Sequence, residues 1–231
     1  QDIPFFILGG LTGSGKTRLL QKTVHQIDLE GLARHRGSTF GCQVNQLQPS
    51  PINWENQLAV ACLKYRHRYP HAGVLLEDES RKIGKNTLPL AFYQKMKASP
   101  LLVLECDINQ RVSMIRTDYV DTAWPLYQQR FQATAEAAFS EFVLTRLARL
   151  KKRLGSLRHQ RVEHIYKAAL GHLFATGESH GFEPGIRMLL TSYYDPMYHY
   201  QLEKKRSQIV FRGNESEILQ WVNTHLTGRA R

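Results

Sequence analysis

The sequence predicts an α/β protein in which helices flank a parallel sheet, with a helical, basic extension on its C-terminal side. Three observations predict this fold. Short apolar runs at residues 5–8, 74–76 and 101–104 are typical of strands buried on both faces of a parallel sheet. Segments whose apolar residues have helical spacing lie between these runs, so strand and helix alternate. After about Thr117 long helical patterns follow one another without intervening strands. We therefore predict a core at residues 1–117 and a helical extension packed on it at residues 118–231.

The predicted elements follow in order along the chain. After the first strand, a helical pattern begins at Lys16 and continues through Leu19, Leu20, Val24 and Ile27. The other elements are a helix around residues 90–98, helical patterns at 131–154 and 161–175, a short β-like run at 209–211, and a closing amphipathic helix that contains Ile218, Leu219 and Trp221.

The first strand leads into the sequence Gly-Leu-Thr-Gly-Ser-Gly-Lys-Thr at residues 10–17, which matches the P-loop pattern GxxxxGK[ST]. Glycines allow successive backbone N–H groups to turn inward and form an anion-binding nest at a helix N-terminus. The lysine then reaches the terminal phosphates, and the threonine hydroxyl binds Mg²⁺. The motif predicts a P-loop NTPase-like core that binds ATP, GTP or another polyphosphate. The predicted contacts are Gly10, Thr12, Gly13, Ser14, Gly15, Lys16, Thr17 and Arg18.

Acidic residues follow the second predicted strand, where a P-loop enzyme places a group that holds the metal or orients a water. Glu77, Asp78 and Glu79 are adjacent there, and crowded carboxylates repel unless a cation offsets their charge. We predict that Glu77 and Asp78, with Thr17, hold a magnesium ion. The alternative is an ordinary acidic loop tip.

Two arginines and a histidine follow the first helix, where small-molecule P-loop kinases bind their second substrate. Arg34 and Arg36 have the planar guanidinium that binds phosphate in a bidentate way. We predict that Arg34, His35 and Arg36 contact an acceptor or a second phosphate, and we count them with Lys16, Thr17 and Asp78 as catalytic candidates. The alternative is a solvated loop.

The net charge of +11 favours a polyanionic partner, because a basic surface attracts nucleic acid through counterion release. Basic residues concentrate between residues 146 and 161, with no acid among them. On one continuous helix Arg146, Arg149 and Arg153 would share a face suited to a phosphate backbone. We predict an RNA-binding surface, and no DNA partner, at Arg146, Arg149, Lys151, Lys152, Arg153, Arg158 and Arg161. The alternative is a plain solvated helix, which would usually mix glutamate with lysine.

The cysteines and the apolar stretches limit the class of protein. Cys42, Cys62 and Cys106 are widely spaced and contain no CxxC pair, so we expect neither a disulfide framework nor structural zinc. No apolar stretch approaches the ~20 residues of a membrane-spanning helix. We expect a cytoplasmic protein without a membrane partner.

Four segments together resemble a known family. They are the P-loop at 10–17, Asp-Leu-Glu-Gly-Leu-Ala-Arg-His-Arg-Gly-Ser at 28–38 with Phe40-Gly41, Glu-Asp-Glu-Ser-Arg at 77–81 with Ile83-Gly84, and Tyr-Tyr-Asp-Pro-Met-Tyr at 193–198. This combination resembles the P-loop domain of tRNA 2-selenouridine synthase over essentially the whole chain. The segment at 28–41 is much more specific than the P-loop, which many unrelated enzymes share.

The resemblance implies a tRNA-modifying transferase that converts a wobble 2-thiouridine of the anticodon arm to 2-selenouridine. Geranyl diphosphate first alkylates the sulfur, and selenophosphate then supplies selenium while the geranylthiol leaves. Both co-substrates carry phosphate, so the P-loop would hold one of them rather than hydrolyse ATP, with Mg²⁺ as an additional ligand.

Members of this family carry a rhodanese-like domain with a catalytic cysteine before the P-loop, whereas nine residues precede the loop here. Two expectations stay open: the chain is part of a longer protein, or it is the P-loop subunit of a split enzyme. In either case we expect the selenium-transfer step to need a rhodanese-like domain or subunit, and we do not assign its role to the cysteines of this chain.

Two other functions remain compatible with the sequence. One is a P-loop kinase that uses ATP and Mg²⁺ to phosphorylate a small metabolite, for which the basic cluster has no purpose. The other is a non-catalytic RNA-binding subunit in which the P-loop is only structural.

Overall fold

The computed structural model describes residues 3–35 and 47–227 and divides the chain into two compact units. The first contains residues 1–10, 14–106 and 202–231, and the second contains residues 11–13 and 107–201. The boundary predicted at 117/118 therefore differs from the one in the structure. The last strand and helix belong to the first unit, because the strand pairs within its sheet.

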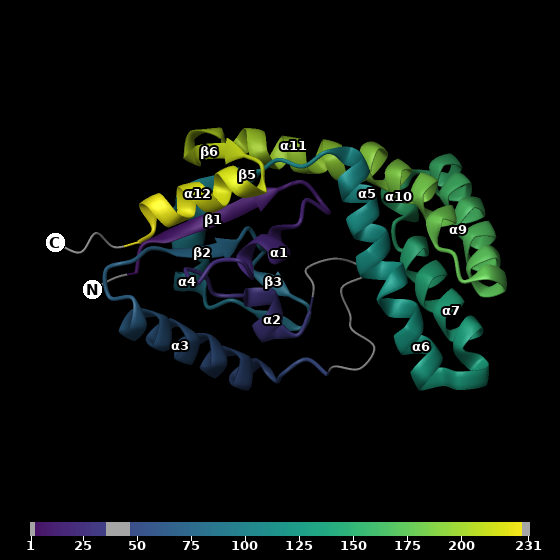
Figure 1. Ribbon diagram of the computed structural model, residues 1–231, viewed down its shortest axis with the longest axis horizontal. Coiled ribbons are helices and arrows are strands. Elements are labelled where there is room, and N and C mark those ends of the chain that lie inside the picture. Colours follow the sequence, from purple (N-terminus) through teal and green to yellow (C-terminus); the bar gives the residue numbers. More distant parts are fainter. Residues whose placement is uncertain (1–2, 36–46, 228–231) are drawn as a thin grey trace. The chain divides into compact units, whose positions relative to one another are not determined.

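The first unit is built on a four-stranded sheet with the order β2-β1-β5-β6, in which every neighbouring pair is parallel. The strands are β1 (Phe5–Gly10), β2 (Val74–Glu77), β5 (Leu101–Leu104) and β6 (Ile209–Gly213). In β1, Ile7 lies opposite Leu76 on one side and Leu101 on the other. The predicted α/β fold with a parallel sheet is confirmed, and so are the strands at its centre (Figure 1).

Helices pack on both faces of this sheet. On one face Leu8, Leu75 and Leu102 form a fully buried cluster with residues of α1 (Lys16–Leu20) and α12 (Glu215–His225). On the other face, the ring of Phe5 packs 4.9 Å from that of Phe92 in α4 (Leu90–Ala98). Each fully buried leucine of this kind contributes about 2 kcal/mol relative to an exposed one.

Helix α1 is shorter than the sequence predicts. It ends at Leu20, and Val24, expected on its buried side, is 62% exposed. The chain turns after α1 and runs beside β2, where Gln26 forms a parallel bridge with Leu75 and the Ile27 N–H donates to the Leu75 carbonyl. These backbone bonds outweigh the helical periodicity of residues 24–27.

Between β1 and α4 in the sequence, the described part of the first unit also contains two further helices and a short hairpin. Helix α2 (Leu29–Ala33) is capped by Asp28, whose carboxylate accepts the Gly31 N–H, and α3 (Pro51–Arg68) begins after Ser50. A short antiparallel hairpin follows β2, formed by β3 (Lys82–Ile83) and β4 (Asn86–Thr87).

The second unit is helical, as predicted. Its helices are α5 (Ile108–Arg116), the π-helix Thr117–Asp121, α6 (Ala123–Phe131), α7 (Ala135–Ala148), α8 (Lys151–Leu154), α9 (Ser156–Thr176), α10 (Glu183–Leu189), the π-helix Leu190–Tyr194 and most of α11 (Asp195–Lys204), with short 3₁₀ turns at 132–134 and 180–182. Aromatic side chains fill its core: Phe139 is fully buried and packs on Trp124 and Tyr127. Figure 1 shows α6, α7 and α9 side by side, and residue contacts join α7 to both of the others.

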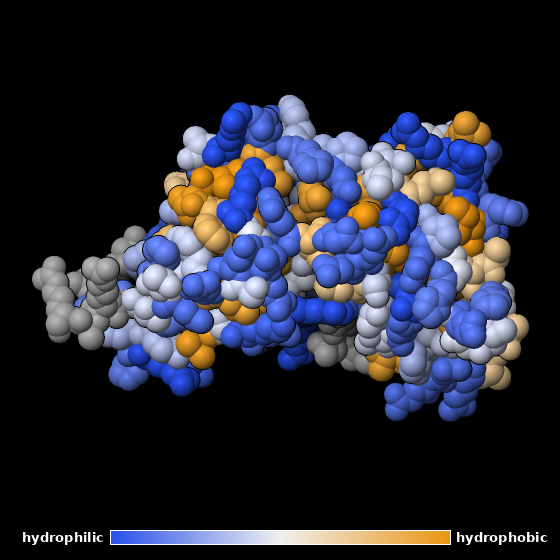
Figure 2. Space-filling model, turned by 45° about the horizontal axis from the view of Figure 1, so that its top comes forward, coloured by the Kyte–Doolittle hydropathy of each residue, from blue (hydrophilic) through white to orange (hydrophobic). Residues whose placement is uncertain are grey.

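Hydrophilic residues predominate on the face shown in Figure 2, where hydrophobic residues form several separate groups. Among the described residues, no helix combines the length and the apolarity that crossing a bilayer requires.

Candidate functional site

The P-loop connects the end of β1 to the start of α1, which is the context that its motif requires. Gly10 and Gly13 have φ angles of +148° and +78°. A Cβ atom at Gly10 would lie 2.7 Å from the Leu104 carbonyl oxygen, and one at Gly13 would lie 2.6 Å from a side-chain carbon of Ile115. Only glycine fits these positions, so the loop has the backbone that an anion-binding nest needs.

The polar side chains of the loop are placed to meet a ligand. The Lys16 ammonium donates to the Gly10 carbonyl at 3.3 Å, and Lys16 and Thr17 occupy the first turn of α1. Ser14 is 5% exposed, and its hydroxyl oxygen has no hydrogen-bond partner among the described residues. Arg18 is exposed on α1. An anion in this loop would meet a lysine, a hydroxyl group and the N-terminus of α1.

A buried arginine fixes the middle of the loop, and the sequence did not indicate it. Arg111 of α5 is 2% exposed, and its Nε atom donates to the Thr12 carbonyl at 2.9 Å. Its two terminal nitrogens donate to the two carboxylate oxygens of Asp195, at 3.1 and 2.5 Å. This bidentate pair holds the guanidinium in one orientation, so the position of the Thr12 peptide group depends on Arg111 and Asp195.

Three carboxylates of the first unit converge beyond the end of β2. One oxygen from each of Glu30, Glu77 and Glu79 lies within 4.8 Å of the others. Burial and the negative charge of Glu30 raise the pKa of Glu77 to about 7, although Lys16 and a hydrogen bond with Thr17 act in the opposite direction. Burial, followed by Glu30 and Glu77, raises the pKa of Glu79 to about 9. A cation at this point would relieve the repulsion.

The carboxylate group suits a hard divalent cation. Glu77 is 3% exposed, and its Oε1 atom has no hydrogen-bond partner in the described part of the chain. Magnesium prefers carboxylate and hydroxyl oxygens, and Thr17 adds a hydroxyl beside Glu77. Glu30 and Glu79, which the sequence analysis did not count as metal ligands, therefore join Glu77 and Thr17 as candidates.

Asp78 lies apart from these carboxylates. Both of its oxygens accept hydrogen bonds from the Lys205 ammonium at 2.6 Å, so its charge is already balanced. Successive side chains at the end of a strand point to opposite sides, so Glu77 and Glu79 share a side that Asp78 does not. The structure therefore does not place Asp78 in the predicted metal site, because its carboxylate pairs with Lys205 away from Glu77 and Glu79.

The basic residues after α2 are only partly described. Arg34 is exposed and adopts a left-handed conformation at the end of α2, with φ of +48°. The His35 N–H donates to the Glu30 carbonyl at 3.1 Å. Arg36 lies outside the described residues. Arg34 and His35 therefore directly follow the helix that carries Glu30.

The basic cluster of the second unit does not lie on one helix. Arg146 is in α7, Lys151 to Arg153 are in α8, and Arg158 and Arg161 are in α9. The shared helical face predicted for Arg146, Arg149 and Arg153 is wrong, because α7 ends at Ala148 and the chain turns again at Gly155, whose φ is +79°.

The exposed cations of this cluster are still close in sequence and mostly without acidic partners. Among the described residues Arg149, Lys152, Arg158 and Arg161 form no ion pair, and all four are exposed. Arg153 donates to the hydroxyl of Tyr193 at 2.7 Å. Six of the seven predicted RNA-binding residues are thus exposed, and Arg146 is half-buried, although the helices that carry them are separate.

Comparison with known proteins identifies relatives over the whole of this site. Residues 3–229 match the family model described as the tRNA 2-selenouridine synthase AAA domain. The proteins named tRNA 2-selenouridine synthase from Marinobacter nauticus and Shewanella woodyi are 44% and 42% identical over 95% of this chain. The protein of that name from Aeromonas salmonicida is 44% identical over 92% of it. The chain spans 60%, 60% and 57% of the lengths of these curated relatives.

Proposed function

The chain belongs to the tRNA 2-selenouridine synthase family, and from this premise we propose that it is the P-loop module of an enzyme that replaces sulfur by selenium in a wobble 2-thiouridine. The observation that carries the proposal is the match over residues 3–229, which includes the P-loop, the carboxylate group and the basic surface. The relatives named tRNA 2-selenouridine synthase are longer than this chain. We therefore propose the complete reaction for this module together with a rhodanese-like domain or subunit.

In the first proposed step, the sulfur of 2-thiouridine attacks C1 of geranyl diphosphate. A carbon–sulfur bond forms, the carbon–oxygen bond breaks, diphosphate leaves with the electron pair, and N3 of the base gives up its proton. Lys16 and the backbone amides of the P-loop would stabilise the negative charge that develops on the diphosphate, which is the main electrostatic requirement of an alkyl transfer. In the second step the selenium of selenophosphate would attack C2 of the base, the carbon–sulfur bond would break, and the geranylthiol would leave with a proton. Water would then cleave the selenium–phosphorus bond and release phosphate.

The residues around the loop have supporting roles in this proposal. Glu77 and Thr17, with Glu30 and Glu79, would hold Mg²⁺, which supplies positive charge to the phosphate oxygens when it is bound. Arg34 and His35 would contact the acceptor nucleotide or the second phosphate. The exposed cations between Arg146 and Arg161 would contact the tRNA backbone, so affinity should fall steeply with salt.

Substitution of Lys16 tests the proposal. Lys16→Ala should abolish geranyl transfer to a thiolated tRNA, measured by mass spectrometry of the modified nucleoside, while tRNA affinity stays close to that of the parent chain. Lys82→Ala is the matched control, because Lys82 is exposed in β3. Equal losses of transfer and of tRNA affinity in Lys16→Ala would contradict the role given to the loop.

Calorimetric titration with geranyl diphosphate, selenophosphate and ATP separates the proposal from its alternatives. Binding of geranyl diphosphate that depends on Lys16 supports it. Binding of ATP alone would favour the small-molecule kinase, and binding of tRNA without any of the three would favour a non-catalytic RNA-binding subunit.

A further inference from the structure

The motif Tyr-Tyr-Asp-Pro-Met-Tyr at residues 193–198 connects the P-loop to the basic surface. Its first tyrosine accepts a hydrogen bond from Arg153, one of the cations of that surface. Its aspartate pairs with Arg111, which holds the Thr12 carbonyl. Residues 11–13 of the P-loop belong to the second unit, so all of these contacts lie within one compact unit.

Helix α5 fixes the middle of the P-loop through two side chains. The Nε atom of Arg111 donates to the Thr12 carbonyl at 2.9 Å. A Cβ atom at Gly13 would lie 2.6 Å from a side-chain carbon of Ile115, so loop and helix are in close contact there. The side chains of Arg111 and Asp195 are 3% and 16% exposed. Because this bidentate pair is largely buried, a displacement of Asp195 would turn the guanidinium and move the Thr12 peptide group.

π-Helices adjoin both members of this ion pair. The π-helix Thr117–Asp121 continues α5, and the π-helix Leu190–Tyr194 ends directly before Asp195, whose N–H donates to the Leu190 carbonyl. Well under ~1% of residues in globular proteins are in π-helices, and single π turns are frequent at functional sites. A π turn contains about one residue more than an α turn, so a change between the two forms would rotate Asp195 relative to Arg111. The π-helix before Asp195 is therefore an element with two available arrangements.

The hydrogen bond between Arg153 and Tyr193 links this π-helix to the basic surface. The Arg153 Nη1 atom donates to the Tyr193 hydroxyl at 2.7 Å, and the Tyr193 ring centroid lies 4.7 Å from that of Tyr194. Arg153 is exposed on α8, so the bond costs its side chain rotational freedom and stabilises the π-helix little by itself. A guanidinium has five N–H donors, so Arg153 can bind a phosphate and keep its bond to Tyr193. A phosphate bound in this way would immobilise the arginine and strengthen its hold on the π-helix.

We propose that Tyr193 and Asp195 are positioning residues that couple RNA binding to anion binding at the P-loop. An RNA phosphate fixes Arg153 on Tyr193. The π-helix then keeps Asp195 on Arg111, and Arg111 holds the Thr12 peptide group in the conformation that accepts a diphosphate. Because such coupling is reciprocal, each ligand raises the affinity for the other by the same factor. The inference rests on the proposed function for the choice of RNA and diphosphate as the two ligands.

Calorimetric titration of inorganic pyrophosphate into the full chain, with and without a saturating anticodon stem-loop RNA, measures this coupling. The parent chain should bind pyrophosphate about tenfold more tightly with RNA than without it, which lies within the usual range for coupled sites. Lys16→Ala defines the part of the binding that belongs to the P-loop, because pyrophosphate bound to other cations would persist in this variant. A parent chain without this enhancement would overturn the proposal.

Tyr193→Phe keeps the ring and removes the hydroxyl that accepts from Arg153. It should bind each ligand alone within about twofold of the parent chain, while RNA no longer enhances pyrophosphate binding. Arg153→Lys keeps the positive charge but lacks the planar fork that holds a phosphate and a tyrosine together, so it should lose the enhancement as well. An enhancement that survives in Tyr193→Phe would refute the role given to this residue.

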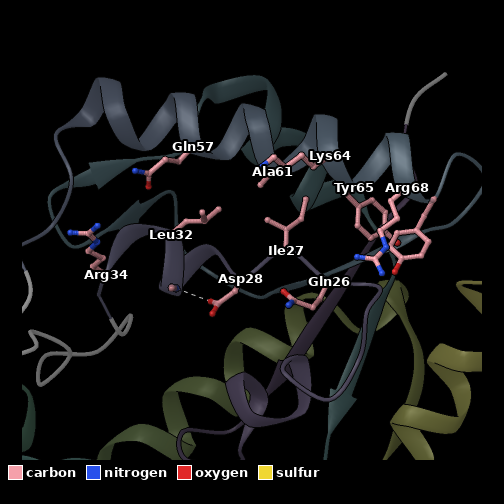
Figure 3. A pocket seen from close by; sticks show the side chains of 12 residues that line it. Gln26, Ile27, Asp28, Leu32, Arg34, Gln57, Ala61, Lys64, Tyr65 and Arg68 are labelled. Carbon is pink, nitrogen blue, oxygen red and sulfur yellow. Dashed lines mark hydrogen bonds between the residues drawn. The ribbon is translucent and has the colours of Figure 1, made fainter.

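Two exposed lysines serve as controls for the loss of a positive charge. Lys152→Ala is the matched variant, because Lys152 adjoins Arg153 in α8. It should weaken RNA binding and leave the enhancement intact. Figure 3 shows Lys64 on α3, where it lines the cavity between α2 and α3 in the first unit. Lys64→Ala should also leave the enhancement intact. If either alanine variant loses it as Tyr193→Phe does, the effect is one of general charge and the proposal is overturned.

Failure of this inference is distinguishable from failure of the proposed function, because neither binding measurement requires catalysis. If the enhancement follows the expected order while no geranyl transfer occurs, the coupling holds without the proposed reaction. If Tyr193→Phe keeps the enhancement while Lys16→Ala loses transfer, only the coupling fails. Where transfer occurs at saturating tRNA, Tyr193→Phe should raise the KM for geranyl diphosphate about tenfold and leave kcat within about twofold, which a general loss of structure would not do.

Discussion

Replacing Glu30 by glutamine should stabilise the first unit at alkaline pH when no divalent cation is present. Glu30 is 8% exposed and lies in the carboxylate group with Glu77 and Glu79, whose pKa values burial and Glu30 raise to about 7 and about 9. A folded-state pKa above the unfolded one means that stability is complete at acid pH and is lost as the pH rises through the folded pKa. The parent chain should therefore lose stability progressively as the pH rises from about 4.5, the ordinary value of the two carboxyl groups, to about 9.

The size of the effect follows from the spacing of the charges. A rise from the ordinary value of 4.5 to about 7 for Glu77 corresponds to roughly 3 kcal/mol. Burial is the larger cause, so Glu30 accounts for part of it. Two charges about 5 Å apart at an effective dielectric constant near 20 interact by about 3 kcal/mol, which gives the order of magnitude of the repulsion from Glu30. We expect Glu30→Gln to raise the free energy of unfolding by roughly 1–3 kcal/mol at pH 8.5 and to change it little at pH 5.5.

Thermal unfolding followed by circular dichroism, with chelator or with Mg²⁺, measures both parts of this prediction. In chelator the variant should melt several degrees higher at pH 8.5, because about 1 kcal/mol corresponds to about 2–4 °C in a chain of this size. Added Mg²⁺ should stabilise the parent chain more than the variant, because the variant has lost one ligand. Glu55→Gln on α3 is the exposed control. The reasoning is refuted if Glu30→Gln destabilises the chain in chelator at pH 8.5, or if both proteins respond equally to Mg²⁺.

Three further predictions concern other parts of the chain. Asp195→Asn should lower stability by about 3 kcal/mol in urea unfolding, because it leaves Arg111 buried without its counter-charge, and should weaken diphosphate binding at the P-loop. Burial lowers the pKa of His25, so stability should fall as the pH drops below about 6.5, and His25→Asn should remove this acid dependence. A double change of Arg158 and Arg161 to alanine should reduce the salt dependence of tRNA affinity by about two in slope, and an unchanged slope would contradict phosphate contacts there.

The sequence predicts the centre of the sheet well because its strands are buried on both faces. Runs such as Leu101 to Leu104 are continuously apolar, and a short apolar run of this length is typical of a strand buried on both faces of a parallel sheet. The end of α1 could not be predicted in the same way. Val24 and Ile27 keep helical spacing, but the backbone of residues 25–27 bonds to β2, and that long-range pairing has no local signal.

The candidate site could be predicted only in part. The P-loop is a local motif, so its residues are evident from the sequence. Side chains alternate along a strand, so the sequence could have shown that Glu79, rather than Asp78, lies on the same side as Glu77. Nothing in the sequence indicates that Glu30 joins them, because α2 brings it to these carboxylates through tertiary packing alone. Arg111 and Asp195 are 84 residues apart in sequence, so neither their ion pair nor the hydrogen bond from Arg111 to the Thr12 carbonyl could be predicted without the structure.

The distribution of ion pairs explains how a chain with a net charge of +11 keeps its basic surface available for a polyanion. Several acids outside the carboxylate group are engaged in ion pairs, such as Asp78 with Lys205 and Asp195 with Arg111. Among the described residues, the exposed cations Arg149, Lys152, Arg158 and Arg161 pair with none of these acids. A bound RNA would therefore replace counterions rather than break an internal ion pair, so salt should weaken RNA affinity strongly while it changes the stability of the fold much less.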